Sequence, residues 1–451
     1  MDYVAAAALL IFVLTLVLMI KRPRGIKIGY AAGIGALASL LVGTVSLGQA
    51  AESFLDIWDA ALAFIGIVAF SVILDAMGFF KWAALKVVRA ARGSGLRLYI
   101  YISLLTAAVS ILFANDSAVL ILTPIVLEII SQLKIDGKGR LAYLFAAGLI
   151  ADTAAMPLIT SNPINILSAD FFGYTFIDHL IIMAPIAVAT IMSSLAIVYL
   201  MFRKKIPQSY DTTAVDILAW SSPIKPQMLK VCIATLVAID VGYVAASMAR
   251  IPVSVVICSV AVFLLAFYMA SLNGEIIRGE RKGLKGLARD INWDIVIFML
   301  ASFIVVEGLA NAGITEVLSS ALLQASSLPS VLSVFVPSII VTIGASFMNN
   351  WPMTILGLVS IDGIAATVAL SGETFTTLVF SNIIGNNLGP HFFPLGSLAI
   401  LMWLEIMKRK GVNISLISYL KVGAVLSIVE VLVASAVLWV EIAVLGLTLT
   451  V

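Results

Sequence analysis

The chain has 451 residues, of which 62% are hydrophobic and only 12% are charged, and its net charge is +2. Soluble globular proteins carry about 25% charged residues, so this composition excludes a soluble fold and predicts a membrane protein. The two cysteines, Cys232 and Cys258, are too few for a disulfide scaffold. The sequence has no nucleotide-binding GxxxxGK[ST] loop, metal-ligating Cys/His set or nucleophile–base pair. We therefore expect neither an enzyme nor a bound cofactor.

Twelve apolar segments follow one another along the chain, and each is long enough to cross a hydrocarbon core of about 30 Å. The first, 2–20, is a retained span and not a signal peptide, because its basic cluster follows the apolar run. Four segments are too long for one span, and each is interrupted by polar residues, Gly or Pro. We predict that 98–134 and 329–370 are re-entrant hairpins and that 141–175 and 374–408 are broken helices. The remaining segments are 28–47, 56–78, 178–202, 228–249, 252–272, 293–312 and 415–447.

Positive charge sets the predicted topology, since Lys and Arg concentrate in cytoplasmic loops. If both hairpins return to the side they entered, 26 of the 27 Lys and Arg residues lie in the cytoplasm and only Arg250 lies outside. A full double crossing by either hairpin leaves this count unchanged, whereas a single crossing would scatter the charges. The distribution predicts ten crossings, with both termini outside the cell.

The chain also repeats itself at an offset of 234–235 residues. Gly78 corresponds to Gly313, "FAND" at 113–116 to "FMNN" at 347–350, and "ADT" at 151–153 to "GNN" at 385–387. Chance similarity between apolar sequences is the alternative, but it does not explain matching polar residues in matching order. Each half has an odd number of crossings, so the second half is predicted to be inverted.

These observations predict an all-α polytopic membrane protein built from an inverted-topology repeat. Each half has five transmembrane crossings and one re-entrant hairpin, with broken helices at the midplane. The first repeat is 1–202 and the second is 228–451, joined by a cytoplasmic linker at 203–227. The tracts 80–92 and 314–327 are predicted to form equivalent helices just before each hairpin.

Polar residues at membrane depth define the predicted site. Unpaired backbone groups cost several kcal/mol each in hydrocarbon, so the interrupted chain must line a cavity or be buried in protein. Transporters with inverted repeats place their substrate between such broken helices, and capping of helix ends is the alternative role for each polar residue. The predicted substrate-binding residues are Asn115, Ser117, Ser161, Asn162, Asn165, Asn349, Asn350, Thr354, Asn386 and Asn387.

Three acidic residues are candidates for proton coupling, because ionisable groups inside a membrane are costly and mark ion or proton sites by default. Asp116 and Asp152 lie at the two interruptions of the first half, where the motif alignment places Asn350 and Asn386 in the second half. Glu307, in "FIVVEGLAN", is the third candidate. His391 follows Pro390 beside a broken helix and has either a cavity-lining or a structural role.

Four motifs together resemble the ArsB family of arsenite and antimonite efflux permeases. They are "FANDSAVLILTPIV", "DTAAMPLITSNPINILSADFFG", "MNNWPMTILGLVSIDG" and "GNNLGPHFFPLGSLAILMWL". The resemblance covers most of the chain and implies a scaffold domain and a moving transport domain. It also implies elevator-like exchange of As(OH)3 or Sb(OH)3 for protons in the cell (plasma or inner) membrane, with an optional soluble arsenite-stimulated ATPase as partner.

The residues fit a neutral substrate better than an anion. No Lys or Arg lies between 141 and 202 or between 290 and 407, whereas amides and hydroxyls offer both donors and acceptors. We therefore predict a proton-driven secondary transporter of arsenite and antimonite that binds no nucleic acid. A sodium-coupled carboxylate carrier or sodium/proton antiporter of the same superfamily, and a passive metalloid channel, remain the alternatives.

Overall fold

The computed structural model describes residues 3–135, 137, 139–211, 224–272 and 282–449. Residues 212–223 of the predicted 203–227 linker lie outside these residues. The described part of the chain is helical and contains no β-strand, which confirms the all-α prediction. Nine of the described helices are long and apolar enough to cross a membrane. Each of the twelve apolar segments contains helix.

The described residues of the first half form ten α-helices and three shorter helical turns. The α-helices are α1 (Tyr3–Lys21), α2 (Ile28–Val42), α3 (Leu47–Ala76), α4 (Phe79–Ala91), α5 (Gly95–Phe113), α6 (Asn115–Gln132), α7 (Gly139–Phe145), α8 (Ala151–Thr153), α9 (Pro163–Phe172) and α10 (Phe176–Phe202). The turns are η1 (Pro23–Gly25), the π-helical η2 (Ala146–Ile150) and η3 (Ile159–Ser161).

The second half continues the same pattern. Its α-helices are α12 (Pro226–Met248), α13 (Val253–Ser271), α14 (Leu284–Asp290), α15 (Trp293–Asn311), α16 (Ile314–Ser326), α17 (Leu332–Met348), α18 (Asn350–Thr367), α19 (Gly372–Leu388), α20 (Leu398–Arg409) and α21 (Leu416–Ala443). Two 3-10 turns, η4 (Gly389–His391) and η5 (Pro394–Gly396), interrupt the chain between α19 and α20.

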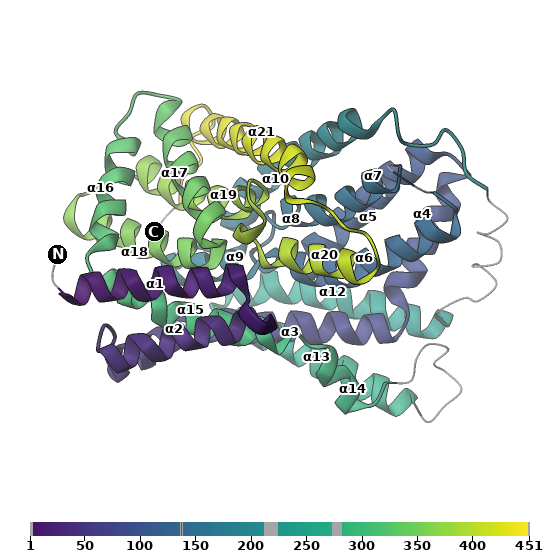
Figure 1. Cartoon of the computed structure of the whole chain (residues 1–451), viewed down its shortest axis with the longest axis horizontal. Helices are drawn as coiled ribbons and strands as arrows, with labels where there is room; N and C mark the ends of the chain where they lie inside the picture. The colour runs from purple at the N-terminus through teal and green to yellow at the C-terminus, as the bar shows by residue number, and fades with distance from the viewer. Residues whose placement is uncertain (1–2, 136, 138, 212–223, 273–281, 450–451) are drawn as a thin grey trace.

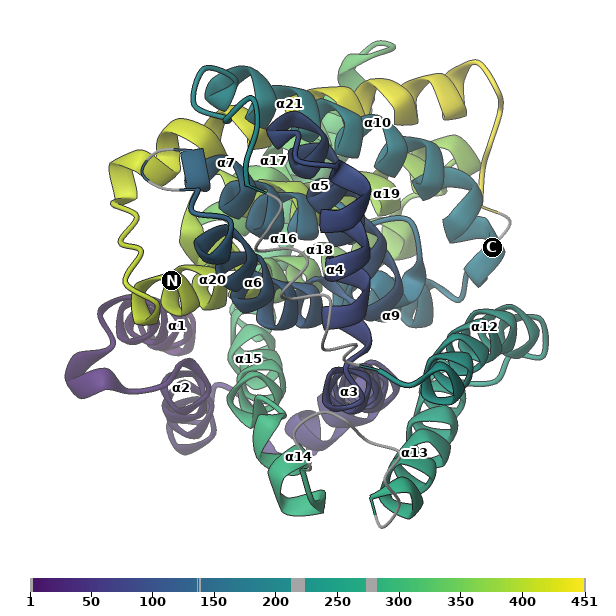
Figure 2. The same cartoon turned by 90° about the vertical axis from the view of Figure 1, so that its right-hand side faces the viewer.

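The helices form two layers, which are seen most clearly in Figure 2. The lower layer contains α1, α2, α3, α12, α13, α14 and α15, and the remaining helices lie above it (Figures 1 and 2). Within the lower layer α15 packs on α2 and α13 on α3, and within the upper layer α17 packs on α19 and α10 on α21. The layers meet where α3 contacts α9 and where α15 contacts α18. Each layer thus contains helices from both halves of the chain.

The two predicted hairpins are present as pairs of packed helices joined at one residue. Ala114 joins α5 to α6 with φ 66° and ψ 154°, and Asn349 joins α17 to α18 with φ 80° and ψ 149°. A positive φ is uncommon for residues other than glycine. The same unusual turn therefore occurs at the tip of both hairpins. Whether the hairpins are re-entrant remains a prediction, because each helix is about as long as a membrane is thick.

The structural boundaries of the two halves correspond at an offset of 235 residues. Gly78 and Gly313 begin α4 and α16 with positive φ. Turn η3 corresponds to η5, and Asn162 and Ser397 cap α9 and α20 with extended backbone and a side-chain hydrogen bond. The element order therefore repeats, while the inverted orientation remains a prediction.

This offset corrects the register of the motif alignment by one residue. Asn115 and Asn350 are both the first residue after the hairpin tip, so Asn350 corresponds to Asn115 instead of Asp116. By the same offset, the counterpart of Asp152 is Asn387 instead of Asn386. The motif alignment was shifted by one residue because the second half has two consecutive Asn residues at each of these sites.

Close packing fixes the broken helix beside Asp152. A Cβ atom at Gly148 would lie 2.5 Å from the ring of Trp403, so only glycine lets α20 approach here. Gly148 is part of the π-helical turn η2, which leads directly into Asp152. Such turns occur mostly as single-turn insertions in helices, frequently at functional sites.

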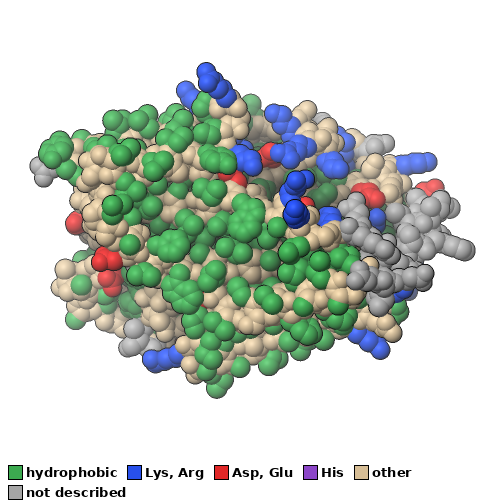
Figure 3. All heavy atoms as spheres, turned by 90° about the horizontal axis from the view of Figure 1, so that it is seen from below, with side chains coloured by type: hydrophobic (Ala, Val, Ile, Leu, Met, Phe, Trp, Pro, Cys, Tyr) green, Lys and Arg blue, Asp and Glu red, His purple; other side chains and the backbone are tan. Residues whose placement is uncertain are grey.

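The underside of the lower layer is apolar. Figure 3 shows hydrophobic side chains over most of this face, with most of the Lys and Arg side chains in its right-hand half and along its upper edge. Exposed apolar residues such as Leu37, Leu41 and Val262 contribute to the surface of these helices. An apolar surface with basic residues gathered away from it is what a bilayer-embedded protein requires.

Candidate functional site: a buried polar centre between the broken helices

Asp152 is the point where three of the four interruptions meet. Its Oδ1 atom accepts a hydrogen bond of 2.6 Å from Asn115 Nδ2 at the tip of the first hairpin. The same oxygen accepts one of 3.1 Å from Ser397 Oγ, which caps α20. Asp152 is 2% exposed. The structure therefore brings Asp152 and Asn115, which were predicted from the sequence, together with Ser397, which was not.

The broken helices of the two halves are also joined by a cluster of amides. Asn162 Nδ2 donates to Asn387 Oδ1 at 2.9 Å, and Asn387 Nδ2 donates to Asn165 Oδ1 at 3.0 Å. The amide of Asn165 donates in turn to the carbonyls of Ala155 and Leu158. These side chains satisfy the backbone of the break, and they connect it to α19.

Several predicted site residues bond mainly to nearby backbone. Asn349 donates to the carbonyl of Leu395 at 2.9 Å, while its Oδ1 caps the Trp351 amide. Thr354 donates to the Asn350 carbonyl, and Ser161 to the Leu158 carbonyl. Asn349 thus caps a helix end, the alternative role weighed from the sequence, whereas Thr354 and Ser161 bond back to the preceding turn.

A different subset carries buried polar atoms without a hydrogen-bond partner among the described residues. These atoms are Ser117 Oγ, Asn350 Oδ1, Asn386 Oδ1 and Asp152 Oδ2. An unsatisfied buried donor or acceptor costs about 1–3 kcal/mol. Orphaned atoms that converge on interrupted helices are therefore candidates for contact with a polar ligand.

The other two predicted acids differ in position. Asp116 lies in the first turn of α6, is 7% exposed, and is close enough to Asp152 for the two carboxylates to repel each other. Glu307 is half-buried on α15, in the lower layer. Helix α15 packs mainly on α2 and also contacts α18, so Glu307 belongs to the other layer from Asp116 and Asp152.

Two further functional candidates are Glu430, which the sequence did not single out, and His391, whose role the sequence left open. His391 Nδ1 lies 2.7 Å from Glu430 Oε2, and His391 Nε2 lies 3.4 Å from Asp152 Oδ2. The latter pair is close, but it lacks hydrogen-bond geometry. Glu430, on α21, also accepts hydrogen bonds from Thr153 Oγ1 at 2.9 Å and from Ser194 Oγ. An acid within an apolar span was the available signal for Glu430.

Thiol ligation is not part of this centre. Cys232 and Cys258 are free and lie on α12 and α13 in the lower layer. Cys232 Sγ lies 4.0 Å from Met77 Sδ, and Cys258 Sγ donates to the backbone carbonyl of Leu62 at 3.6 Å. The described residues also contain no group of three or more His, Cys, Asp or Glu that could hold a metal ion.

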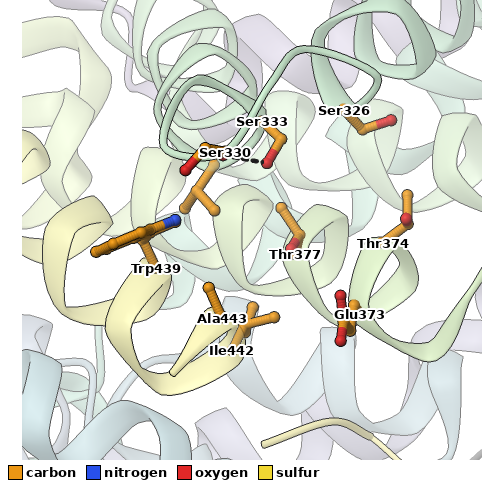
Figure 4. Close-up of a pocket in the computed structure, with 10 residues that line it drawn as sticks. Ser326, Ser330, Ser333, Glu373, Thr374, Thr377, Trp439, Ile442 and Ala443 are labelled. Atoms are coloured by element: carbon orange, nitrogen blue, oxygen red, sulfur yellow. Dashed lines mark hydrogen bonds between the residues drawn. The ribbon is translucent and has the colours of Figure 1, made fainter. Parts of the chain in front are cut away.

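Two cavities lie elsewhere in the upper layer. One, of about 230 Å³, is formed by α17, α19, α21 and the α16–α17 loop, and Figure 4 shows Ser326, Ser333, Thr377 and Glu373 around it, beside Trp439. The other, of about 510 Å³, is lined by residues of α6 together with Arg140 and Lys410. Asp152, His391 and Glu430 line neither cavity, so these two openings do not reach the polar centre.

The helical bundle has an apolar surface, and its interrupted helices enclose buried carboxylates and amides. This combination defines a membrane transporter. The comparisons with known proteins specify which kind. The model of the ArsB family, arsenical pump membrane protein, matches residues 7–442. The chain belongs to this family, which is a family of transporters and not of enzymes.

Individual relatives agree with this assignment over the full length. The arsenical pump membrane protein of Escherichia coli is 39% identical over 95% of this chain and 97% of its own. That of Yersinia enterocolitica is 38% identical over 98% of both chains. Among solved structures, the YdaH transporter of Alcanivorax borkumensis is similar, with a TM-score of 0.53, 14% sequence identity and 89% coverage of each chain. At that identity, the likeness concerns the fold alone.

Proposed function

We propose that this protein exports arsenite and antimonite from the cytoplasm, as the neutral trihydroxides, in exchange for protons. Membership of the ArsB family supports the substrate class. The observation that carries the proposal is the set of orphaned neutral atoms on Ser117, Asn350 and Asn386, which are buried at the interrupted helices, as is the carboxylate of Asp152. A small neutral solute with several hydroxyl groups would satisfy these atoms.

The chemistry of the centre favours reversible binding. Hydroxyl and amide groups exchange hydrogen bonds with water at little net cost, typically about 0.5–1.5 kcal/mol each. Trivalent arsenic binds thiolates tightly, which would slow its release, and both cysteines lie on helices of the other layer. The substrate is therefore held by oxygen and nitrogen atoms.

We infer that the upper layer carries the substrate past the lower layer in an elevator-like motion. The hairpins and the broken helices all belong to the upper layer (Figure 2). The lower layer, which meets it at α3 and α15, would be the scaffold. This division supports alternating access, in which one body moves as a unit relative to the other.

Proton coupling is assigned to the acids of the centre. Asp116 and Asp152 are buried and close to one another, so loss of a proton leaves charge where water does not screen it. Glu307 is now a weaker candidate, because its helix lies in the other layer. Exchange then requires that proton and metalloid compete for the same buried oxygens.

The protein is proposed to lie in the cell (plasma or inner) membrane with both termini outside. The positive-inside rule supports this orientation, since 26 of the 27 Lys and Arg residues then face the cytoplasm. Family resemblance adds an optional soluble ATPase on that face. The gradient-driven exchange proposed above does not require it.

Arsenite flux into proteoliposomes that contain the purified protein tests the proposal. The pH gradient is imposed in either direction, with and without sodium, and no ATPase is added. We expect uphill accumulation that follows the proton gradient and is unchanged by sodium. Accumulation that requires sodium, or flux that only dissipates the arsenite gradient, would favour a sodium-coupled carrier or a channel instead.

A further inference from the structure

We infer that Asp152, His391 and Glu430 form one proton-binding unit, in which the exchanged proton is held between Asp152 and His391 and Glu430 is the fixed counter-charge. This inference deepens the proposed proton exchange and rests on it. It moves the proton from a single acid to a chain of three side chains, which come from α8, η4 and α21. All three are at most 2% exposed.

The hydrogen bonds assign a distinct role to each nitrogen of His391. A carboxylate only accepts, so Nδ1, which lies 2.7 Å from Glu430 Oε2, must carry a hydrogen. The opposite nitrogen, Nε2, faces Asp152 Oδ2 at 3.4 Å, and neither atom has a hydrogen-bond partner among the described residues. A proton on either atom lets one donate to the other, so this gap is where a proton can be gained and lost.

Glu430 is hydrogen-bonded through both of its carboxylate oxygens. One of its oxygens accepts from Thr153 and Ser194, and the other accepts from His391. Hydroxyl groups stabilise a carboxylate but do not neutralise it, and His391 is the basic side chain among these contacts. Glu430 therefore holds the imidazole in place and favours a positive charge on it.

Charge counting explains how the unit couples the two fluxes. With the exchangeable proton bound, two carboxylates and one imidazolium leave one net negative charge. Without it, two uncompensated carboxylates remain at membrane depth, where isolated charge is expensive. A hydroxyl of the metalloid can donate to the freed Asp152 oxygen in place of the proton. The neutral metalloid does not change the net charge, but its hydroxyl satisfies the Asp152 oxygen that the proton has left. Proton and metalloid therefore compete for this oxygen, which is the condition for exchange.

The repeat indicates that folding does not need these charges. By the offset of 235, Asp152 corresponds to Asn387 and His391 to Met156. The last helix of each half begins after a capping Thr175 or Ser415, so there the offset is 240. Glu430 then corresponds to Thr190. None of the three ionisable residues has an ionisable counterpart.

The backbone beside His391 is nevertheless held in the same way in both halves. Tyr419 donates to the carbonyl of His391 at 3.0 Å, and His179 Nε2 lies 2.9 Å from the carbonyl of Met156. His179 and Tyr419 occupy equivalent positions, by the same offset of 240. The shared scaffold supports the break, and each of the three ionisable residues is present in only one of the two equivalent positions.

Two other titratable groups face the unit. Asp116, on α6, interacts electrostatically with Asp152. Tyr419, on α21, interacts with Asp152 and Glu430. The remaining side chains that bond to the unit are neutral, namely Asn115, Thr153, Ser194 and Ser397. A pH response that is lost when Glu430 alone is neutralised would therefore identify the unit, since Asp116 and Tyr419 are still present.

The test is Glu430→Gln in the full chain, reconstituted in proteoliposomes that contain a pH-sensitive dye. We expect proton movement per arsenite, and uphill accumulation, to fall by at least about tenfold, the factor that corresponds to one pKa unit. Downhill arsenite exchange should persist. Glu441→Gln is the matched control. Glu441 is also buried on α21, but it is neither a member of the unit nor one of the residues bonded to it. Glu430→Asp should restore part of the coupling.

A binding measurement separates this role from a purely structural one. In detergent, the arsenite affinity of the native protein should weaken as the pH falls from 8 to 6. Because protons compete with arsenite, we expect the affinity to fall by roughly tenfold for each pH unit. The affinity of Glu430→Gln and of His391→Gln should lose this dependence. Unchanged proton stoichiometry in Glu430→Gln overturns the inference, and so does failure of both variants to fold. A native protein that ignores the pH gradient would instead overturn the proposed function.

Discussion

Asp152 and Asn387 occupy the same position in the two halves of the chain, and each accepts a hydrogen bond from the capping residue of the opposite half. Ser397 donates to Asp152 at 3.1 Å, and Asn162 donates to Asn387 at 2.9 Å. Ser397 and Asn162 are themselves equivalent by the offset of 235. The centre is therefore a pair of matching cross-links, of which only one contains a charge.

This pairing makes Asp152→Asn the most informative single substitution. It copies Asn387, so size and hydrogen bonding are kept while titration is removed. We expect arsenite exchange down its gradient to continue and uphill, pH-driven export to be lost. Proteoliposome accumulation at matched protein amounts measures both. Wild-type accumulation by Asp152→Asn would place the coupling proton elsewhere.

Asp116→Asn tests the second acid separately. Asp116 repels Asp152 electrostatically, and its side chain is not held by a hydrogen bond among the described residues. If the exchanged proton lies between Asp152 and His391, as inferred above, removal of Asp116 should leave proton-driven export in place. It should also shift the pH at which the rate is half-maximal, since Asp152 loses a like-charged neighbour. A rate profile between pH 5 and 9 shows the shift. Complete loss of coupling would instead make Asp116 the proton carrier.

Ala114 gives a prediction on stability. Its φ of 66° with ψ of 154° is a region that glycine enters freely, and such strain costs about 1–3 kcal/mol. Because glycine also loses more entropy on folding, Ala114→Gly should stabilise the protein by about 1 kcal/mol net. Ala114→Val should destabilise it. Thermal unfolding in detergent checks both, and a lower melting temperature for the glycine variant would contradict the assigned turn.

The orientation in the membrane is testable with single cysteines in a background that lacks Cys232 and Cys258. Lys204→Cys, at the cytoplasmic linker, should be protected from an impermeant thiol reagent in intact cells. Ser327→Cys, after α16, should be labelled from outside. Labelling of position 204 from outside would exclude the proposed inverted arrangement.

The same background tests whether thiols hold the metalloid. Neither cysteine contacts the polar centre, so replacement of both by Ser should leave arsenite export within about twofold of the native rate, a change of less than 0.5 kcal/mol in barrier. Export is measured in cells with equal amounts of inserted protein. A loss of export in a well-folded double variant would show that a thiol takes part.

The sequence by itself determined the helices, the breaks and the repeat, because these depend on local chemistry. A run of about 20 apolar residues must become a membrane helix, and Asn, Gly and Pro within such a run must interrupt it. The predicted break at "FAND" falls at Ala114 in the structure, and the one at "FMNN" falls at Asn349. The family resemblance likewise rested on residues that lie at these breaks, and the comparisons confirm it.

Only the tertiary structure decided which polar side chains meet. Glu430 lies 39 residues from His391 and in a different element, so nothing local to either residue predicts their hydrogen bond. The layers likewise mix helices from both halves, so Glu307 and Asp116 lie in different layers although both were candidates for proton coupling. Sequence spacing determines contacts within a helix, whereas contacts between helices depend on how their apolar faces pack. In this protein the packing brings three ionisable residues that are far apart in the sequence into one buried unit.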